Sequence, residues 1–207
     1  MHPRCAAGRH AVSNQLFVHA LCHKPNGERV SRLLRVGFSL KPALMLEILP
    51  ETPAKHASAI EDLFDRTFGS GHFAKTAERL REYSASLPEI NRVAVLDGVV
   101  VGVCRVWPLV VGPSRDRALF YGPVAVARSH RGSRLGLTVT GEALEAGKAA
   151  GWPAAVLIGA PDYFGEIGFT VVPKGQLSFG SPHDPARGLV RDLAGGANAL
   201  KGRGRAP

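Results

Sequence analysis

Cysteine is scarce in this sequence. The 207 residues include three, Cys5, Cys22 and Cys104, which lie far apart and form no C-x-x-C pair. An odd number of isolated cysteines argues against a disulfide framework, which needs paired cysteines and an oxidising compartment. We therefore expect a cytoplasmic protein whose fold depends on an apolar core.

Long apolar runs are also absent. The most apolar stretch, residues 99–111, is interrupted by Arg105 and Pro108 and falls short of the roughly 20 apolar residues that span a bilayer. Residues 1–44 lack the apolar core and cleavage site of a secretory signal. The sequence thus predicts no membrane partner.

Several catalytic and metal-binding patterns are missing. No G-x-S-x-G and no H-E-x-x-H occurs, so neither a serine-hydrolase nucleophile turn nor a zinc-protease helix is predicted. His19, Cys22 and His23 resemble part of a metal-ligand set, but a structural zinc site needs a second cluster. We expect no metal.

An excess of acidic residues is lacking as well, and the formal net charge is +9. The positive charge lies at the ends: residues 1–44 hold seven Lys or Arg and one acid, Glu28, and residues 201–207 hold three more bases. The sixteen basic and sixteen acidic residues between these two ends give no net charge. The body therefore lacks the positive electrostatic potential that attracts a phosphate backbone. Nucleic-acid binding could draw only on the termini, and we predict no nucleic-acid partner.

What is present is enough for one domain. The composition is 45% hydrophobic and 21% charged, and 207 residues suit one core. Convincing strand and helix patterns begin at Met45. We therefore predict a domain at residues 45–200, an N-terminal extension at residues 1–44 that is disordered or precedes the true start, and a mobile basic tail at residues 201–207.

The body alternates strands and helices. A strand at residues 45–49 precedes a helix that starts at Thr52 or Pro53 and stops at Gly69, and Asp97-Gly98 is typical of a hairpin turn. Gly122-Pro123 should bend the strand that contains it. Further helices are predicted at residues 76–87, 135–150 and 162–167, and strands at residues 92–96, 99–106, 117–126, 154–158, 169–172, 176–179 and 188–193.

Three motifs carry a family resemblance. They are G-P-V-A-V at residues 122–126, R-G-S-R-L-G at residues 131–136, and Y-F-G-E-I-G-F at residues 163–169. Together they resemble GNAT acetyltransferases, in which an L-x-V strand end, a Q/R-x-x-G-x-G/A loop and a later Y-x-x-x-G-F follow in this order. The resemblance implies an α/β (α+β) fold with a mixed central sheet of six to seven strands, flanking helices, and strands splayed at a coenzyme A site. It also implies an N-acetyltransferase, monomeric or homodimeric, that moves the acetyl group of acetyl-coenzyme A to an amine.

The loop suits an anion for a physical reason. Small residues before a helix leave backbone N–H groups unpaired, and the helix dipole adds positive potential there. A solvated basic loop that caps an ordinary helix is the alternative. By resemblance, the pyrophosphate of coenzyme A would lie against Arg131, Gly132, Ser133, Arg134, Leu135, Gly136 and Leu137.

The bent strand suits a thioester. If Gly122-Pro123 splays it from its parallel neighbour, peptide groups there lack ladder partners and can bind the pantetheine arm. The residues concerned are Val124, Ala125 and Val126. An N–H there can stabilise negative charge on the carbonyl oxygen while the amine attacks directly. A plain core strand bent by the proline is the alternative.

Two positions depart from the family pattern. Arg134 stands where the first loop glycine is expected, and Phe164 stands where the thiolate-protonating tyrosine is expected. Tyr163, the neighbour of Phe164, is our candidate catalytic residue. The departures leave a second hypothesis open, a GNAT-like domain that binds acyl-coenzyme A without turnover. No general base is assigned from Glu142, Glu145, Asp162, Glu166 and His72.

Overall fold

The computed structural model describes residues 7–12, 15–23, 29–36, 45–69, 84–179 and 184–207. The chain divides into two compact units, Met1–Leu44 and Met45–Pro207. Each unit has a sheet of its own.

The first unit holds a small antiparallel sheet. Its strands are β1 (Ala7–Val12), β2 (Gln15–His23) and β3 (Arg29–Val36), and each pairs with the next along the chain. No strands were predicted from the sequence of residues 1–44, and the three strands correct that prediction. The reason is that hairpin strands pair through backbone groups, which need no apolar alternation to do so. The hypothesis that Met45 is the true start stays a prediction.

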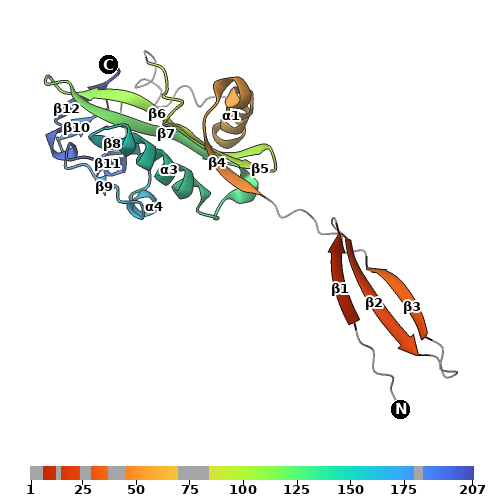
Figure 1. Ribbon diagram of the computed structural model, residues 1–207. Coiled ribbons are helices and arrows are strands. Elements are labelled where there is room, and N and C mark those ends of the chain that lie inside the picture. The colour runs from red at the N-terminus through yellow and green to blue at the C-terminus, as the bar shows by residue number, and fades with distance from the viewer. Residues whose placement is uncertain (1–6, 13–14, 24–28, 37–44, 70–83, 180–183) are drawn as a thin grey trace. The chain divides into compact units, whose positions relative to one another are not determined.

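The second unit is built on a nine-stranded mixed sheet with the order β10-β12-β6-β7-β8-β11-β9 and with β4 and β5 continuing from β6 (Figure 1). Between the strands that the structure describes in this unit, two pairs, β7–β8 and β10–β12, are parallel and the others antiparallel. The strands are β4 (Leu46–Pro50), β5 (Arg92–Leu96), β6 (Val99–Val111), β7 (Asp116–Val126), β8 (Ala154–Ile158), β9 (Thr170–Val171), β10 (Leu177–Ser178), β11 (Gly188–Asp192) and β12 (Gly202–Arg205). The predicted mixed sheet is confirmed. The predicted count of six to seven strands was too low: all eight extended segments named from the sequence are strands of the sheet, and β12, which was not recognised, is the ninth.

Three helices among the described residues flank this sheet: α1 (Pro53–Phe68), α3 (Leu135–Ala149) and α4 (Pro161–Gly165). All three were predicted, and Gly69 ends α1 as expected. Short 3-10 turns are η2 (Arg128–His130), η3 (Pro185–Arg187) and η4 (Ala197–Ala199). The helix predicted at residues 76–87 lies mostly outside the described residues, and its described part, residues 84–87, is not helical.

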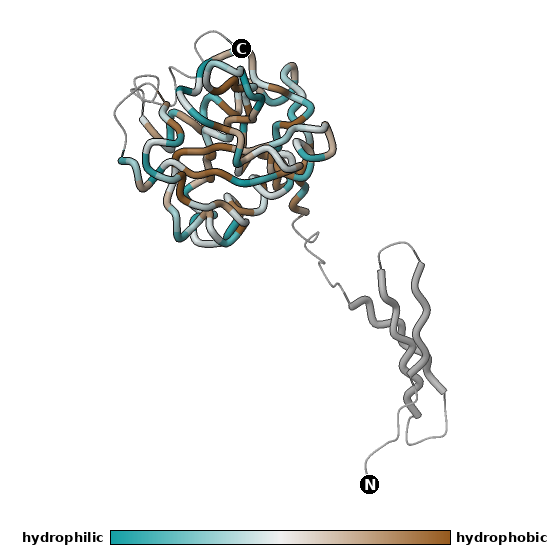
Figure 2. The backbone as a smooth tube through the Cα atoms, turned by 90° about the vertical axis from the view of Figure 1, so that its left-hand side faces the viewer, coloured by the Kyte–Doolittle hydropathy of each residue, from teal (hydrophilic) through white to brown (hydrophobic). Residues whose placement is uncertain are grey.

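Alternate residues of β6 and β7 pack against opposite layers. Val103 and Ala125 contact the buried side of α1, whereas Cys104 and Val124 belong to the cluster that packs on α3. The C-terminal segment covers the remainder of the α1 face through Phe179 and other buried residues. In Figure 2 the strands that cross the middle of this unit are mostly brown and the surrounding loops mostly teal or white, as expected for a buried sheet.

The end of the chain is part of the sheet, which corrects the prediction of a mobile tail. Gly204 and Arg205 of β12 pair with Val111 and Val110 of β6, and the Gly112 N–H donates to the Arg203 carbonyl at 3.1 Å. The strands approach closely because glycines meet there: a Cβ on Gly112 would lie 2.2 Å from the Lys201 carbonyl oxygen. The Lys and Arg residues from which a mobile tail was predicted carry no information about this backbone pairing.

Candidate functional site

A gap opens between two parallel strands, β7 and β8. Their ladder pairs Leu119, Phe120 and Tyr121 with residues 155–157, and within the described residues it has no pair beyond Tyr121. β7 nevertheless continues to Val126 along β6. The predicted splay is therefore present, and it begins at Gly122-Pro123.

The peptide groups that face this gap follow from the β6–β7 ladder. The Ala127 N–H donates to the Val101 carbonyl at 2.8 Å. Peptide groups of successive strand residues point to alternate sides, so Ala125 also faces β6. Val124 and Val126 then face the gap, where the described part of β8 offers them no ladder partner. Two of the three predicted residues thus present free peptide edges.

The irregularity spans both strands. On β6 the register shifts between Cys104 and Val106, whose partners are Val124 and Tyr121. Arg105 is therefore directly across from Gly122-Pro123. Pro123 has no N–H to donate, and Gly122 has a φ of 134°, which is open only to glycine. These residues interrupt the ladder at the point where the gap begins.

The start of α3 lies next in the chain after the gap. No side chain caps it: Arg134 at the N-cap makes no side-chain hydrogen bond to the helix. Two amides of the predicted anion loop are used locally, since Arg131 donates to Arg128 and Ser133 to His130. The N–H groups of the first turn, residues 135–137, have no intrahelical acceptor. The anion-binding potential therefore lies at the helix start and not along the whole loop.

Arg134 adopts the left-handed conformation that its glycine-like position requires, with φ 62° and ψ 7°. Its guanidinium pairs with the Glu166 carboxylate after α4, and both side chains are exposed. The side chain is thus held outside the helix start, as an arginine at this position must be. The exposed pair itself contributes at most about 1 kcal/mol.

Two variants isolate the backbone strain at Arg134. Arg134→Gly and Arg134→Ala both lose the ion pair, but only glycine is relaxed at positive φ. We expect the glycine variant to be more stable than the alanine variant by about 1 kcal/mol, measured by urea unfolding. Equal stability, or a more stable alanine variant, would show that this residue is not in the left-handed conformation in solution.

Tyr163 of α4 reaches the start of α3. A Cβ built on Gly136 would lie 2.6 Å from the Tyr163 hydroxyl oxygen and 3.5 Å from Cγ2 of Val126. The Tyr163 hydroxyl, the first turn of α3 and the Val126 side chain therefore lie close to one another. Glycine at position 136 leaves the room that the hydroxyl occupies.

Phe164 lies elsewhere, although the motif places it at the position of the family tyrosine. Its ring packs on Gly159, where a Cβ would come within 2.5 Å of the ring edge, and against Phe169 with ring centroids 6.2 Å apart. It is thus part of the apolar cluster under α3. Of the two neighbouring aromatics, Tyr163 is the one that the fold brings to the site.

The acidic candidates are not brought together. Glu166 pairs with Arg134, Glu145 lies 3.9 Å from Arg191, and Asp162 is in the first turn of α4. His72 lies outside the described residues. A charged group that the sequence did not single out, Glu51 with Arg105, lies across from the strand break. An arginine inside an apolar strand was the signal that could have found it.

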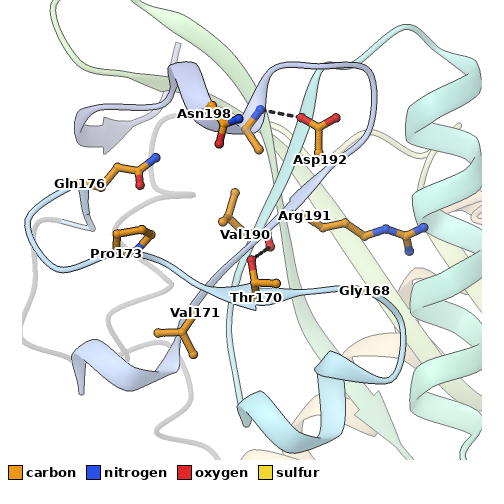
Figure 3. A pocket seen from close by; sticks show the side chains of 10 residues that line it. Gly168, Thr170, Val171, Pro173, Gln176, Val190, Arg191, Asp192 and Asn198 are labelled. Atoms are coloured by element: carbon orange, nitrogen blue, oxygen red, sulfur yellow. Dashed lines mark hydrogen bonds between the residues drawn. The ribbon is translucent and has the colours of Figure 1, made fainter.

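A separate hollow of about 350 Å³ lies between β9, β11 and η4. Three of its polar side chains are already engaged: the Thr170 hydroxyl donates to Val190, the Gln176 amide to Leu200, and Asp192 accepts from Gly195 and Ala197. These backbone donors hold the pKa of Asp192 below its ordinary value. In Figure 3 Arg191 extends away from this hollow toward α3. We find there no set of free groups that converge on a ligand.

Within the described ranges, none of the helices is both long enough and apolar enough to cross a membrane. No group of three or more His, Cys, Asp or Glu side chains in that part of the chain is placed to hold a metal ion. Cys104 is buried, which raises the pKa of its thiol to about 12.

Comparisons with known proteins point to one superfamily. No protein-family profile and no curated protein matches the sequence. Among solved structures, a GNAT family N-acetyltransferase (YhbS) from Escherichia coli in complex with CoA is 28% identical, with a TM-score of 0.69 over 82% of this chain and 94% of that chain. A GNAT family acetyltransferase from Brucella melitensis in complex with acetyl-CoA is 26% identical, with a TM-score of 0.50 over 61% of this chain and 83% of that one.

A more distant structure agrees in fold alone. An acetyltransferase of the GNAT family from Staphylococcus aureus is 12% identical, with a TM-score of 0.50 over 72% of this chain and 99% of that one. The fold of this chain therefore occurs in several solved structures of GNAT acetyltransferases.

Proposed function

We propose that this chain is an acyltransferase of the GNAT superfamily and that it transfers an acetyl group from acetyl-coenzyme A to an amine by direct attack. The acceptor is a small amine, an amino sugar or a protein amino group. No metal takes part in this proposal.

One observation carries the proposal: free peptide edges at Val124 and Val126 lie beside an uncapped helix start. An extended pantetheine arm can pair with such edges as an added strand. A pyrophosphate suits the N–H groups and dipole of the helix start. The E. coli and Brucella proteins, which contain CoA and acetyl-CoA, support the same ligand here.

We assign the coenzyme to the residues predicted from the sequence. Val124, Ala125 and Val126 form the strand that holds the pantetheine arm, although Ala125 contributes through its position and not through a free peptide edge. The pyrophosphate would lie against Arg131, Gly132, Ser133, Arg134, Leu135, Gly136 and Leu137, with the main contacts from the first turn of α3.

In the reaction, the amine nitrogen attacks the thioester carbonyl carbon and the carbon–sulfur bond then breaks. A gap-facing N–H, at Val124 in this proposal, stabilises the negative charge on the carbonyl oxygen. The coenzyme A thiolate leaves and takes a proton from the Tyr163 hydroxyl. The proton released by the amine passes to water, because no base is assigned, and the Tyr163 phenolate takes up a proton from water, so that the tyrosine is restored.

The test combines binding with turnover. Isothermal titration with acetyl-coenzyme A and coenzyme A should show binding, and a thiol-release assay with ethanolamine, an aminoglycoside and a peptide α-amine should identify a class of acceptor. Binding without thiol release on any amine would favour the second hypothesis, a binding module. Arg134 and Phe164, the two departures from the family pattern, are the observations behind that alternative.

Val126 allows the backbone to be tested separately from the side chain. Val126→Pro removes an N–H that faces the gap and leaves the ladder to β6 intact, whereas Val126→Ala keeps the N–H. Since a hydrogen bond left unmade costs about 1–3 kcal/mol, we expect the proline variant to bind acetyl-coenzyme A roughly tenfold to a hundredfold more weakly. The alanine variant should stay within about threefold of the natural protein. Equal affinity of the two variants would refute the strand-pairing role.

A further inference from the structure

Where the β5–β6 ladder ends, the side chain of Asn91 takes the place of a further strand residue. The β5–β6 ladder stops at Arg92 and Cys104. Beyond it, the Val106 N–H donates to Oδ1 of Asn91 at 2.7 Å, and the Val106 carbonyl accepts from the Leu87 N–H at 2.9 Å. The Asn91 amide and the turn before it thus take the place of a next strand residue. Both peptide groups of Val106 are satisfied in this way.

Asn91 is completely buried and is connected to two further polar residues. Its Nδ2 donates to Oε2 of Glu51 at 2.7 Å and to the Ser86 hydroxyl at 3.2 Å. Glu51 is 6% exposed and accepts a bidentate contact from Arg105, with Nε at 3.0 Å and Nη2 at 2.8 Å. We call Asn91, Glu51 and Arg105 the polar clamp.

The polar clamp joins three segments. Glu51 immediately precedes the α1 N-cap, Asn91 immediately precedes β5, and Arg105 is in the middle of β6. Arg105 also reaches Oε1 of Glu61 on α1 at 2.7 Å. Burial disfavours the charged guanidinium, but the hydrogen bonds and charges of both glutamates outweigh it, so the pKa of Arg105 lies above its ordinary value.

The clamp is directly across from the break in β7. Arg105 is the residue skipped by the register shift, between the pairs Cys104–Val124 and Val106–Tyr121. The β6–β7 ladder is interrupted between Val106 and Cys104, and it resumes at the pair Cys104–Val124. The positions of Val106 and Cys104 therefore determine where Val124 is placed. The clamp fixes Val106 through its N–H.

Stability alone is a weak reason for such a clamp. A buried ion pair is often no more stabilising than packed apolar side chains of the same volume, and its best-supported benefit is a defined geometry. An apolar residue at position 91 could not bond the Val106 N–H. The polar group at position 91 fixes the position of Val106 and therefore the register of β6 with β7 across from the gap.

We propose that Asn91 is a positioning residue for acetyl transfer: through Val106, and supported by Glu51 and Arg105, it fixes the part of β6 that holds Val124 at the thioester. The inference rests on the proposed function. It assigns the three residues no contact with the acetyl group. Their effect is on where the gap-facing peptide groups of β7 are placed.

The test compares two buried variants. Asn91→Ala removes the clamp, while Leu109→Ala truncates a side chain that is 1% exposed on the same strand, away from the break. With acetyl-coenzyme A and whichever panel amine the natural protein acetylates, kcat of Asn91→Ala should fall about tenfold to a hundredfold, as a small misplacement of reacting groups predicts. Leu109→Ala should retain kcat per folded molecule. The Kd for coenzyme A should rise by a smaller factor than kcat falls in Asn91→Ala, because the N–H groups at the start of α3 are untouched, and should stay within about threefold in Leu109→Ala.

Amide exchange by NMR adds a readout that needs no turnover. We expect exchange at Ala125 and Ala127, whose N–H groups face β6, to be faster in Asn91→Ala than in Leu109→Ala. If Asn91→Ala does not fold, Arg105→Lys keeps the charge, loses the bidentate contact, and should change kcat in the same direction. Equal kcat and equal exchange in the clamp and control variants would overturn the proposal. A natural protein that neither binds acetyl-coenzyme A nor releases thiol would instead refute the proposed function, and the exchange comparison would still decide whether the clamp holds the strand.

Discussion

Replacing Tyr163 by phenylalanine is expected to lower kcat of acetyl transfer about a hundredfold, the lower end of what a positioned acid contributes. The substitution removes one oxygen atom and retains the ring that contacts Phe164 at a centroid distance of 5.0 Å. The Kd for coenzyme A should stay within about twofold, because the proton is needed only when the carbon–sulfur bond breaks. Thiol release under saturating acetyl-coenzyme A measures the first quantity and titration calorimetry the second.

The neighbouring position supplies the control. Phe164→Tyr places a hydroxyl where the family pattern has one, but this ring packs on Gly159 and Phe169, whereas the Tyr163 hydroxyl is the group that lies next to Gly136. Adding this change to Tyr163→Phe should therefore not restore turnover. Recovery of kcat in the double variant, or an unchanged kcat in Tyr163→Phe alone, would mean that Tyr163 is not the proton donor.

Replacing Gly112 by alanine is expected to destabilise the protein by about 2–5 kcal/mol. Gly112 has a φ of 67°, which costs a residue with a Cβ about 1–2 kcal/mol. The new Cβ would also lie 2.2 Å from the Lys201 carbonyl oxygen, so β12 must move away. That movement loses the bond from the Gly112 N–H to Arg203 and leaves polar groups unpaired, at about 1–3 kcal/mol. Urea unfolding followed by circular dichroism measures the change.

Gly98→Ala separates the two costs. Gly98 has a φ of 81° but no heavy atom within 4 Å of the added Cβ, so only the backbone cost of about 1–2 kcal/mol applies. If Gly112→Ala is no more destabilising than Gly98→Ala, the close approach of β12 to the β6 end is absent in solution. The pair therefore also tests whether residues 202–205 are a strand.

Local patterns predicted the elements that carry the proposed coenzyme site. Asp97-Gly98 marked the β5–β6 hairpin, and Gly122-Pro123 marked the point at which β7 leaves β8. The apolar period of α3 and its start at Leu135 were also visible in the sequence. Each of these depends on the φ preferences or spacing of residues close together in the chain, and such signals survive without knowledge of the fold.

Contacts between distant residues were decided by the tertiary structure. The sequence alone determined that an α/β body with a bent strand, a basic loop and a helix follows Met45, because turn residues and apolar periods act locally. Only the fold placed Tyr163 against Gly136, joined Glu51 and Asn91 to Arg105, and made the basic end of the chain a strand beside β6. Those pairings depend on packing and backbone hydrogen bonds between segments far apart in sequence, which no local pattern encodes.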